Sequence, residues 1–224
     1  MTSNKENIVN YKRIYEYRFK NINRQTKNKI WKVIAEFIYK KLEEPEIVID
    51  PAAGECEFIN AIPAKEKWAI DLNKIFLEQN AASEVKKIAG NCIEIELPKN
   101  YFDAVFVSNF VEHLNDGKEV TFFLEKMHSL LKKDGKIVIM GPNFKYCAKN
   151  YFDFADHNVI ITETSMAEYL YGAGFEHIKI YPKFLPLSFR GNLPINKFLT
   201  RMYLCLPVLW NVFGRQYLLF GTKM

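Results

Sequence analysis

The sequence has few of the features that would place it outside the ordinary globular classes. No apolar run is long enough to span a bilayer, and the best candidate, residues 197–210, is interrupted by Pro207. The charges of residues 1–6 have no apolar run behind them, so neither a secretory signal nor a transit peptide is predicted. Internal repeats and low-complexity linkers are also missing. These absences favour one globular domain, and we expect it to work in the cytoplasm.

Metal-binding motifs are missing as well. Neither H-E-x-x-H nor C-x-x-C occurs, and the four cysteines lack the paired spacing of a zinc site. We therefore expect reduced, structural cysteines and a metal-independent reaction. The cysteines are Cys56, Cys92, Cys147 and Cys205.

Acidic residues are absent from the end of the chain, because Glu176 is the last one. The lysines and arginines that follow it have no acid to balance them. At the other end, residues 1–45 hold 11 Lys or Arg against 5 Asp or Glu, whereas the remaining residues hold 20 against 21. Both ends of the chain can therefore face an anionic partner.

What the chain does have is a regular alternation of strand and helix patterns. Short apolar, β-branched runs predict strands, and apolar residues at helical spacing predict the helices between them. Strands that alternate with helices predict an α/β fold with a doubly wound, seven-stranded, mostly parallel sheet. The predicted strands lie at 46–50, 67–71, 87–89, 102–108, 136–140, 176–181 and 217–222.

Two helices are predicted ahead of this core, over 8–20 and 27–41. In the second, apolar residues recur at i, i+3, i+4 and i+7, so they form one stripe that docks on the core, while lysines occupy the other face. We therefore expect an N-terminal helical extension, residues 1–45, packed on a core of residues 46–224 within a single domain.

Local signals mark the ends of two later helices. A helix over 117–131 is expected to stop at Asp134-Gly135, where glycine can take the left-handed cap. The box formed by Ser165 and Glu168 predicts the start of the next helix, and Gly172-Ala173-Gly174 predicts its end.

The stretch Asp50-Pro51-Ala52-Ala53-Gly54 joins the first strand to a helix, which is where nucleotides bind in such sheets. It lacks the G-x-G-x-x-G of a dinucleotide site, and its acid would repel a diphosphate. A carboxylate there suits an ammonium group and a sulfonium centre instead. Asp71, at the end of the second strand, can accept both hydroxyls of a ribose. Together these residues favour S-adenosylmethionine over NAD.

With these residues in view, the chain resembles the class I S-adenosylmethionine-dependent methyltransferases. The resemblance rests on the pattern strand-D-x-G-x-G-x-F, an acid after the second strand, and S-N-x-x-E-H-L after the fourth. Here these read Asp50–Phe58, Asp71 and Ser108–Leu114, with Ala52 and Cys56 in place of two motif glycines. Further segments are similar to a bacterial subgroup associated with cell-surface polysaccharide or sugar-modifying pathways. These segments are 141–143, 151–157, 184–186 and 213–218.

The resemblance implies S-adenosylmethionine as methyl donor and S-adenosylhomocysteine as product. Asn91 stands where the family has an acid, and its amide oxygen can still accept a bond from the adenine amino group. The implied cofactor-binding residues are Asp50, Ala52, Ala53, Gly54, Asp71, Leu72, Asn91, Cys92, Ser108, Asn109 and Phe110.

Methyl transfer to a hydroxyl requires a nearby base that takes the proton. His157, in a loop after the fifth strand, is the first candidate, and His113 is the second. Asp156, which precedes His157, is the third residue expected to take part in catalysis. His128 and His177 are interpreted as surface or packing histidines. Aromatic residues are expected to wall the acceptor pocket: Tyr146, Tyr151, Phe152 and Phe154.

The expected reaction is O-methylation of a sugar, a nucleotide-linked sugar or a glycan end. The alternative is a non-catalytic relative that serves as a binding partner in a biosynthetic complex. Nucleic acid is not expected, because Ser108-Asn109-Phe110-Val111 replaces the base-flipping signature N-P-P-[YF]. Residues 197–210 are interpreted as a helical excursion packed before the last strand. A second interpretation makes them a basic amphipathic surface that touches the inner face of the membrane.

Overall fold

The computed structural model describes residues 14, 17, 24–187 and 196–224 of the chain. Its centre is a seven-stranded sheet with the order β3-β2-β1-β4-β5-β7-β6. Strands β1 to β5 run parallel, and β7 runs antiparallel to both β5 and β6. The predicted fold class is therefore confirmed. The strands are β1 (Ile47–Asp50), β2 (Glu66–Asp71), β3 (Val85–Ala89), β4 (Phe102–Ser108), β5 (Leu131–Pro142), β6 (Phe175–Tyr181) and β7 (Gln216–Lys223).

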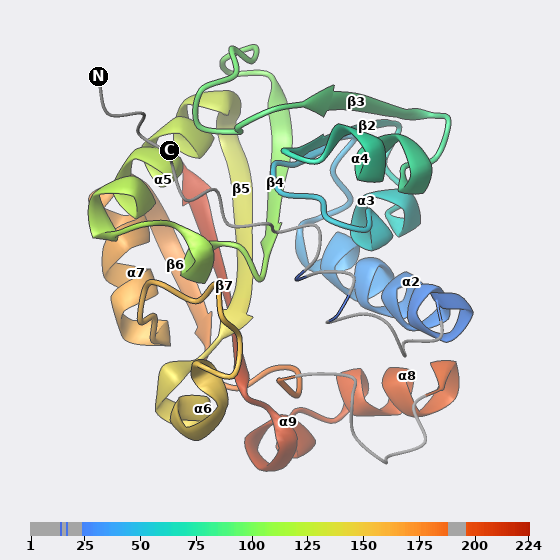
Figure 1. Cartoon of the computed structure of the whole chain (residues 1–224), viewed down its shortest axis with the longest axis vertical. Coiled ribbons are helices and arrows are strands. Elements are labelled where there is room, and N and C mark those ends of the chain that lie inside the picture. The colour runs from blue at the N-terminus through green and yellow to red at the C-terminus, as the bar shows by residue number, and fades with distance from the viewer. Residues whose placement is uncertain (1–13, 15–16, 18–23, 188–195) are drawn as a thin grey trace, which may run out of the picture.

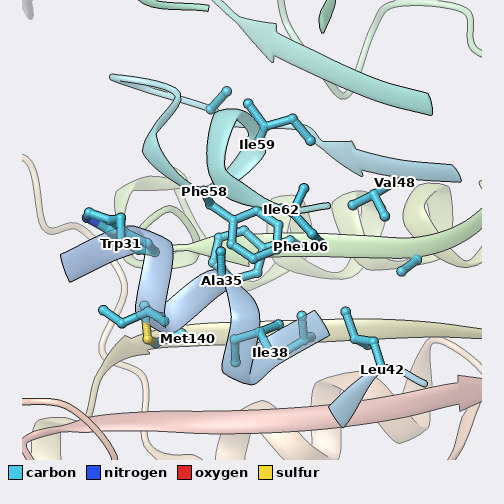
Figure 2. Packing of buried hydrophobic residues seen from close by; sticks show 14 of the residues in the cluster. Trp31, Ala35, Ile38, Leu42, Val48, Phe58, Ile59, Ile62, Phe106 and Met140 are labelled. Carbon is cyan, nitrogen blue, oxygen red and sulfur yellow. The ribbon is translucent and has the colours of Figure 1, made fainter. Parts of the chain in front are cut away.

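Helices cover both faces of the sheet (Figure 1). One hydrophobic cluster joins the sheet to α2, α3, α8 and α9, and a second joins it to α5 and α7. In the first cluster Phe58 stacks on Phe106 of β4, with ring centroids 3.4 Å apart (Figure 2). The helices are α2 (Arg24–Lys41), α3 (Glu57–Ala61), α4 (Lys74–Asn80), η1 (Val111–His113), α5 (Gly117–Leu130), α6 (Phe144–Tyr151), α7 (Glu163–Gly172), α8 (Lys197–Cys205) and α9 (Pro207–Phe213).

Helix α2 carries the predicted apolar stripe. Ile30, Val33, Ile34 and Ile38 are buried against the core, and most of the lysines of the helix are exposed. Lys27 is the exception, because its side chain turns inward to Glu55 and Glu57. The helix predicted over 8–20 lies outside the described residues except at positions 14 and 17.

The predicted stop at Asp134-Gly135 is wrong in its detail. Helix α5 ends at Leu130, and β5 begins at once with Leu131. Asp134, not Gly135, takes the left-handed conformation, with φ of 62°. Glycine is needed at 135 for a different reason: a Cβ there would lie 2.8 Å from the carbonyl oxygen of Lys132.

The predicted capping box of α7 is also placed wrongly. Thr162 is the N-cap, and its hydroxyl accepts a bond from the backbone N–H of Ser165. Ser165 in turn accepts from the backbone N–H of Thr162, so it is the third residue of the helix and not its cap. The helix ends, as predicted, at Gly172, and Gly174 follows in a left-handed conformation.

Residues 197–213 form the predicted helical excursion before the last strand, as helices α8 and α9. Trp210 is buried and meets Phe37 of α2 and Phe184 edge-on, with ring centroids 5.9 and 5.0 Å apart. Arg201 pairs with Glu36 of α2 at 3.1 Å. Across the described ranges, no helix combines the length and the apolar character needed to cross a bilayer.

Candidate functional site

The residues predicted to bind the cofactor follow the carboxyl ends of neighbouring parallel strands, which meet at one edge of the sheet. β1 ends at Asp50, β2 at Asp71 and β4 at Ser108. Because β1 pairs with both β2 and β4, the segments after these strands lie side by side. Two surface hollows, of about 340 and 390 Å³, lie elsewhere, one beside Asp103 and the other beside Tyr169.

The loop after β1 is a tight turn that leaves room beside its glycine. Ala53 donates its N–H to Ile70 of β2, and Cys56 donates to the carbonyl of Ala53. Gly54 has a φ of +52°, and no atom lies within 4 Å of the place where a Cβ would stand. The loop can therefore admit a ligand close to its backbone at Gly54.

Cys56 occupies a motif position that the family fills with glycine, and the structure shows what this replacement costs. Its φ is 61°, in the left-handed region, where a side chain other than glycine is strained by about 1–2 kcal/mol. The side chain is fully buried at the start of α3, which offsets part of that cost. The turn is thus kept without the glycine.

Asp50 is the buried acid of this site. Only 4% of the residue is exposed, and the backbone N–H of Ala52 donates to Oδ1 at 3.3 Å. Burial, together with the nearby carboxylates of Asp71 and Glu57, raises the pKa of Asp50 to about 8. A cation beside this carboxyl would stabilise its ionised form, and the sulfonium and ammonium groups of S-adenosylmethionine are such cations.

Asp71 is held by two backbone bonds, one to each oxygen. Gly54 donates to Oδ2 at 2.9 Å and Asn73 to Oδ1 at 2.8 Å. Burial raises the pKa of Asp71, and these two bonds oppose that rise. Each carboxylate oxygen keeps a second lone pair, so the group can still accept ribose hydroxyls. Leu72, next along, is largely exposed and offers an apolar surface.

Lys27 fastens helix α2 to the loop after β1. Its Nζ lies 2.5 Å from Glu55 Oε2 and also contacts Glu57, and the three side chains are nearly buried. The ion pair therefore lies next to the loop after β1, although the sequence predicted the lysines of α2 on the solvent face. A single helical stripe could not reveal that the first turn reaches over the loop.

Asn91 begins the turn that follows β3. Its Oδ1 accepts the N–H of Ile93 at 2.9 Å, and its Nδ2 donates to Glu94 at 3.0 Å. The oxygen retains one lone pair for the adenine amino group, so the proposed role is compatible with this geometry. Cys92 is buried beside it, as the prediction of a structural cysteine requires.

The last group of residues predicted to bind the cofactor follows β4. Asn109 has a left-handed φ of 50°, and its Nδ2 donates to Ser108 Oγ at 2.9 Å. Phe110 is half-buried and packs on Phe123, with ring centroids 5.0 Å apart. The assignment of these residues to the cofactor stays a prediction.

His113 and His157, the two predicted bases, lie together, with ring centroids 5.0 Å apart. The Nδ1 atom of His113 lies 2.8 Å from the backbone oxygen of Asp156 and 3.4 Å from its Oδ2. Because the carbonyl oxygen can only accept, His113 donates to it from Nδ1. His157 is buried, stacked on Phe154 at 4.8 Å and in edge contact with Tyr151.

Glu112 belongs to this cluster, although the sequence singled out only its neighbour. Its side chain is buried, with 1% of the residue exposed, and Oε1 lies 4.0 Å from His113 Nε2. One ligand atom each from Glu112, His113 and His157 falls within 4.8 Å of the others. Glu112 directly precedes His113 in the short 3₁₀ helix η1. This adjacency was the one feature of the sequence that could have indicated a role for the glutamate.

The predicted aromatic wall is divided by the structure. Tyr146 and Phe152 are exposed and Phe154 is half-buried, so all three can face an acceptor. Tyr151 is fully buried, and its hydroxyl donates to the carbonyl of Val159 at 2.6 Å. It therefore belongs to the core and is not exposed to an acceptor.

The remaining histidines lie where they were predicted. His128 packs edge-on against Phe175, with centroids 5.0 Å apart, and burial lowers its pKa. His177 is exposed on β6.

Comparison with known proteins agrees with this geometry. Residues 49–139 match a family model described as a methyltransferase domain. No curated protein sequence matches the chain.

Solved structures with this fold are numerous. One is an S-adenosylmethionine-dependent methyltransferase from Archaeoglobus fulgidus, 21% identical, with a TM-score of 0.68 over 96% of this chain and 100% of that one. Another, from Thermotoga maritima, is described as a possible histamine N-methyltransferase; it is 15% identical, with a TM-score of 0.68 over 95% and 99% of the chains. A phosphoethanolamine N-methyltransferase from Haemonchus contortus, solved with S-adenosylhomocysteine, is 14% identical, with a TM-score of 0.54 over 80% of this chain and 48% of that one.

The sheet order and the acids at its carboxyl edge define the class I methyltransferase fold. At these identities the structural likeness shows the fold, and the family match covers residues 49–139. The chain accordingly has the fold of the class I S-adenosylmethionine-dependent methyltransferases, and residues 49–139 match a methyltransferase domain. No comparison favours the non-catalytic alternative.

Proposed function

We propose that this chain is an S-adenosylmethionine-dependent methyltransferase, which transfers the methyl group to a hydroxyl of a sugar, a nucleotide-linked sugar or a glycan end. The observation that carries the proposal is the pair of imidazoles, His113 and His157, which lie 5.0 Å apart in the segments that follow β4 and β5. A hydroxyl must lose a proton during transfer, and imidazole is the side chain best suited to take it near neutral pH. The sugar as substrate class is supported by the sequence resemblance to the polysaccharide-associated subgroup.

The chain's own residues divide the work of the reaction. The bound cofactor supplies an activated methyl group on its sulfonium. Asp50 and Asp71 would hold the two ends of that cofactor, beside the loop at Gly54. His157 would take the proton that the acceptor hydroxyl loses when its oxygen accepts the methyl group. His113 is the second candidate for this role.

The acceptor would lie against the exposed aromatic residues beside the histidines. Tyr146 and Phe152 belong to α6 and the turn after it, and the Nζ atom of Lys183 stands 4.5 Å over the ring of Tyr146. Aromatic faces with an adjacent cation suit a sugar ring that carries an anionic group such as a phosphate. This arrangement supports a nucleotide-linked or lipid-linked sugar over a neutral one.

Peripheral contact with a membrane is the second part of the proposal. Helices α8 and α9, with Leu206 between them, expose seven large apolar side chains and carry no acidic residue. Lys197 and Arg201 on α8 add positive charge to this surface, as binding to anionic lipid requires. The exposed residues are Phe198, Leu199, Met202, Leu206, Val208, Val212 and Phe213.

A methyl-transfer assay tests the proposal. Wild-type protein and labelled S-adenosylmethionine would be offered nucleotide sugars and short glycans, and label transfer would be counted. We expect transfer to a hydroxyl, and a loss of about 10²-fold or more in His157→Ala with cofactor binding retained. The matched control is His177→Ala, which removes an exposed histidine and should leave transfer unchanged.

Two results would contradict the proposal. If calorimetry detects no S-adenosylmethionine binding by the wild type, the proposed methyltransferase activity is contradicted. Full turnover in both His157→Ala and His113→Ala would remove the histidines from the role of base.

A further inference from the structure

We propose that Glu112, His113 and His157 form a binding site for a divalent transition-metal ion such as Zn²⁺. One ligand atom from each residue lies within 4.8 Å of the other two. The inference goes beyond the proposed function and does not depend on it, because binding of an ion is measured without any methyl acceptor.

The chemistry of the three side chains selects the class of ion. Two imidazoles with one carboxylate form a set that Zn²⁺, Co²⁺ and Ni²⁺ accept. Mg²⁺ and Ca²⁺ prefer sets made of oxygen alone, so the imidazoles disfavour them. Three protein ligands leave the fourth position of a tetrahedral Zn²⁺ ion to water or to another small ligand.

The spacing of the ligand atoms is close to what such an ion needs. Zn²⁺ binds imidazole nitrogen and carboxylate oxygen at about 2.0–2.2 Å, so two atoms on one ion lie at most about 4.2 Å apart. Glu112 Oε1 and His113 Nε2 are 4.0 Å apart and meet this limit. Because every pair in the set lies within 4.8 Å, side-chain movements of about 1 Å bring all three atoms onto one ion.

The backbone holds the three ligands in place. Glu112 and His113 are neighbours in η1. The carbonyl of Glu112 accepts the N–H groups of Asn158 and Val159, at 2.8 and 3.1 Å. The side-chain amide of Asn158 donates to the carbonyl of His113 at 3.2 Å. The loop that carries His157 is therefore bonded directly to the turn that carries the other two ligands, which lowers the entropic cost of gathering them around an ion.

An independent observation comes from the opposite side of the His113 ring. A metal-binding histidine usually donates its second ring N–H to a carbonyl or a carboxylate, which fixes the orientation of the ring. His113 has such a partner, because its Nδ1 lies 2.8 Å from the backbone oxygen of Asp156 and 3.4 Å from Oδ2 of the same residue. A neutral ring with its proton on Nδ1 presents the lone pair of Nε2 to a metal, on the side of Glu112.

The surroundings of the cluster also suit an ion. Glu112 and His157 are buried, with 1% and 8% of each residue exposed. The ring of His157 stacks on Phe154 and meets Tyr151 edge-on, so aromatic groups cover this part of the site and limit its contact with water. His113 is partly exposed, which gives an ion a path from solvent.

A bound ion would also act on the proposed reaction. It would occupy one ring nitrogen of each histidine and so compete with the proton that His157 is proposed to take. Added Zn²⁺ should therefore lower methyl transfer, and a chelator should restore it. This consequence rests on the proposed function: transfer that Zn²⁺ leaves unchanged in protein shown to bind the ion would contradict the role of His157 as base, and not the metal site.

The experiment is a titration of metal-free protein without an affinity tag, in which Co²⁺ binding is followed by visible absorption and Zn²⁺ binding by competition. All proteins carry Cys205→Ser, because Cys205 is exposed and thiolates bind these ions. We expect one ion per chain. Glu112→Gln, His113→Ala and His157→Ala should each weaken binding by about 10²-fold or more, since even the loss of an outer partner of a ligand costs about 10–100-fold.

Two variants serve as matched controls. His177→Ala removes an exposed histidine on β6. Glu163→Gln removes another buried carboxylate, which accepts from Asn143 at 2.7 Å. Both should bind Co²⁺ and Zn²⁺ as the parent protein does.

Two results would overturn the proposal. One is the absence of visible Co²⁺ bands and of saturable Zn²⁺ binding in protein with all three ligands intact. The other is an unchanged affinity in the three ligand variants, with circular dichroism showing that they are folded. Should one of these variants fail to fold, the affinities of the other two decide. Failure of methyl transfer to every hydroxyl would instead contradict the proposed function alone.

Discussion

The backbone N–H of Gly54 donates to Asp71 Oδ2 at 2.9 Å, so the loop after β1 and the acid that ends β2 form one unit. Asn73 donates to the other oxygen. A substitution at Asp71 should therefore act in two ways, through the proposed ribose contact and through the shape of the loop.

Asp71→Asn should weaken S-adenosylmethionine binding by about tenfold or more, because it loses the charge and one acceptor position. Calorimetry measures the affinity directly. Glu78→Gln on α4 removes an exposed carboxylate that pairs with Lys87, and it should bind as the wild type does. Equal affinities in Asp71→Asn and the wild type would show that the acid does not touch the ribose.

Binding of S-adenosylmethionine should release a proton near neutral pH. Burial raises the pKa of Asp50 to about 8, so the carboxyl is largely protonated in the free protein at pH 7. The cationic ligand favours the ionised form and lowers that pKa. Affinity should accordingly rise with pH up to about 8, and calorimetry in buffers of different ionisation enthalpy should detect the proton. Asp50→Asn should abolish the release, and a release that persists there would assign the proton to another group.

The same carboxyl should make the free protein less stable as pH rises. Between pH about 4 and 8 the unfolded chain has lost the Asp50 proton while the folded chain keeps it. The unfolded state then binds fewer protons, so the free energy of unfolding falls by up to about 1.4 kcal/mol per pH unit from this group. Urea unfolding at pH 5, 6, 7 and 8 should show a shallower decline in Asp50→Asn. Parallel declines in the two proteins would contradict a raised pKa.

Thiol reagents should react faster with one cysteine than with the other three. Cys205 is exposed, whereas burial raises the pKa values of Cys56 and Cys92 to about 12 and that of Cys147 to about 11. Ellman's reagent should label one thiol in the folded protein and four after unfolding, because only a thiolate within reach of solvent reacts. Cys205→Ser should eliminate the fast reaction, and fast labelling that remains would mean that a buried thiol is accessible.

Vesicle flotation tests the surface of α8 and α9. The wild type should float with vesicles that contain anionic lipid, and less so at high salt. The double variant Phe198→Ser, Val208→Ser should lose this binding, because both side chains are about two-thirds exposed. Tyr171→Ser removes an apolar side chain of similar exposure from α7 and serves as the control. Absence of the wild type from the floated fraction would reject membrane contact.

The tertiary structure decided several local details that patterns left open. The sequence placed a cap at Ser165, whereas the hydroxyl of Thr162 is the one that reaches the free N–H groups of α7. Either residue satisfies the pattern of a helix start, and only the direction from which the chain enters selects between them. Tyr151 was expected at the acceptor pocket, whereas the structure buries it. An aromatic residue in a loop-rich segment can face inward or outward, and the sequence pattern does not distinguish the two.

What the sequence alone determined is the sheet and the edge where the chemistry lies. Buried β-branched runs that end in Asp50 and Asp71 predict parallel strands, and parallel strands bring their carboxyl ends to one edge, so both acids had to meet there. The tertiary structure decided which side chains from distant segments join them. Lys27 on helix α2 contacts Glu55 in the loop after β1. Glu112 and His113 lie beside His157, although these residues are far apart in the sequence and no motif spacing connects them. Such contacts depend on how loops pack, which periodicity does not encode.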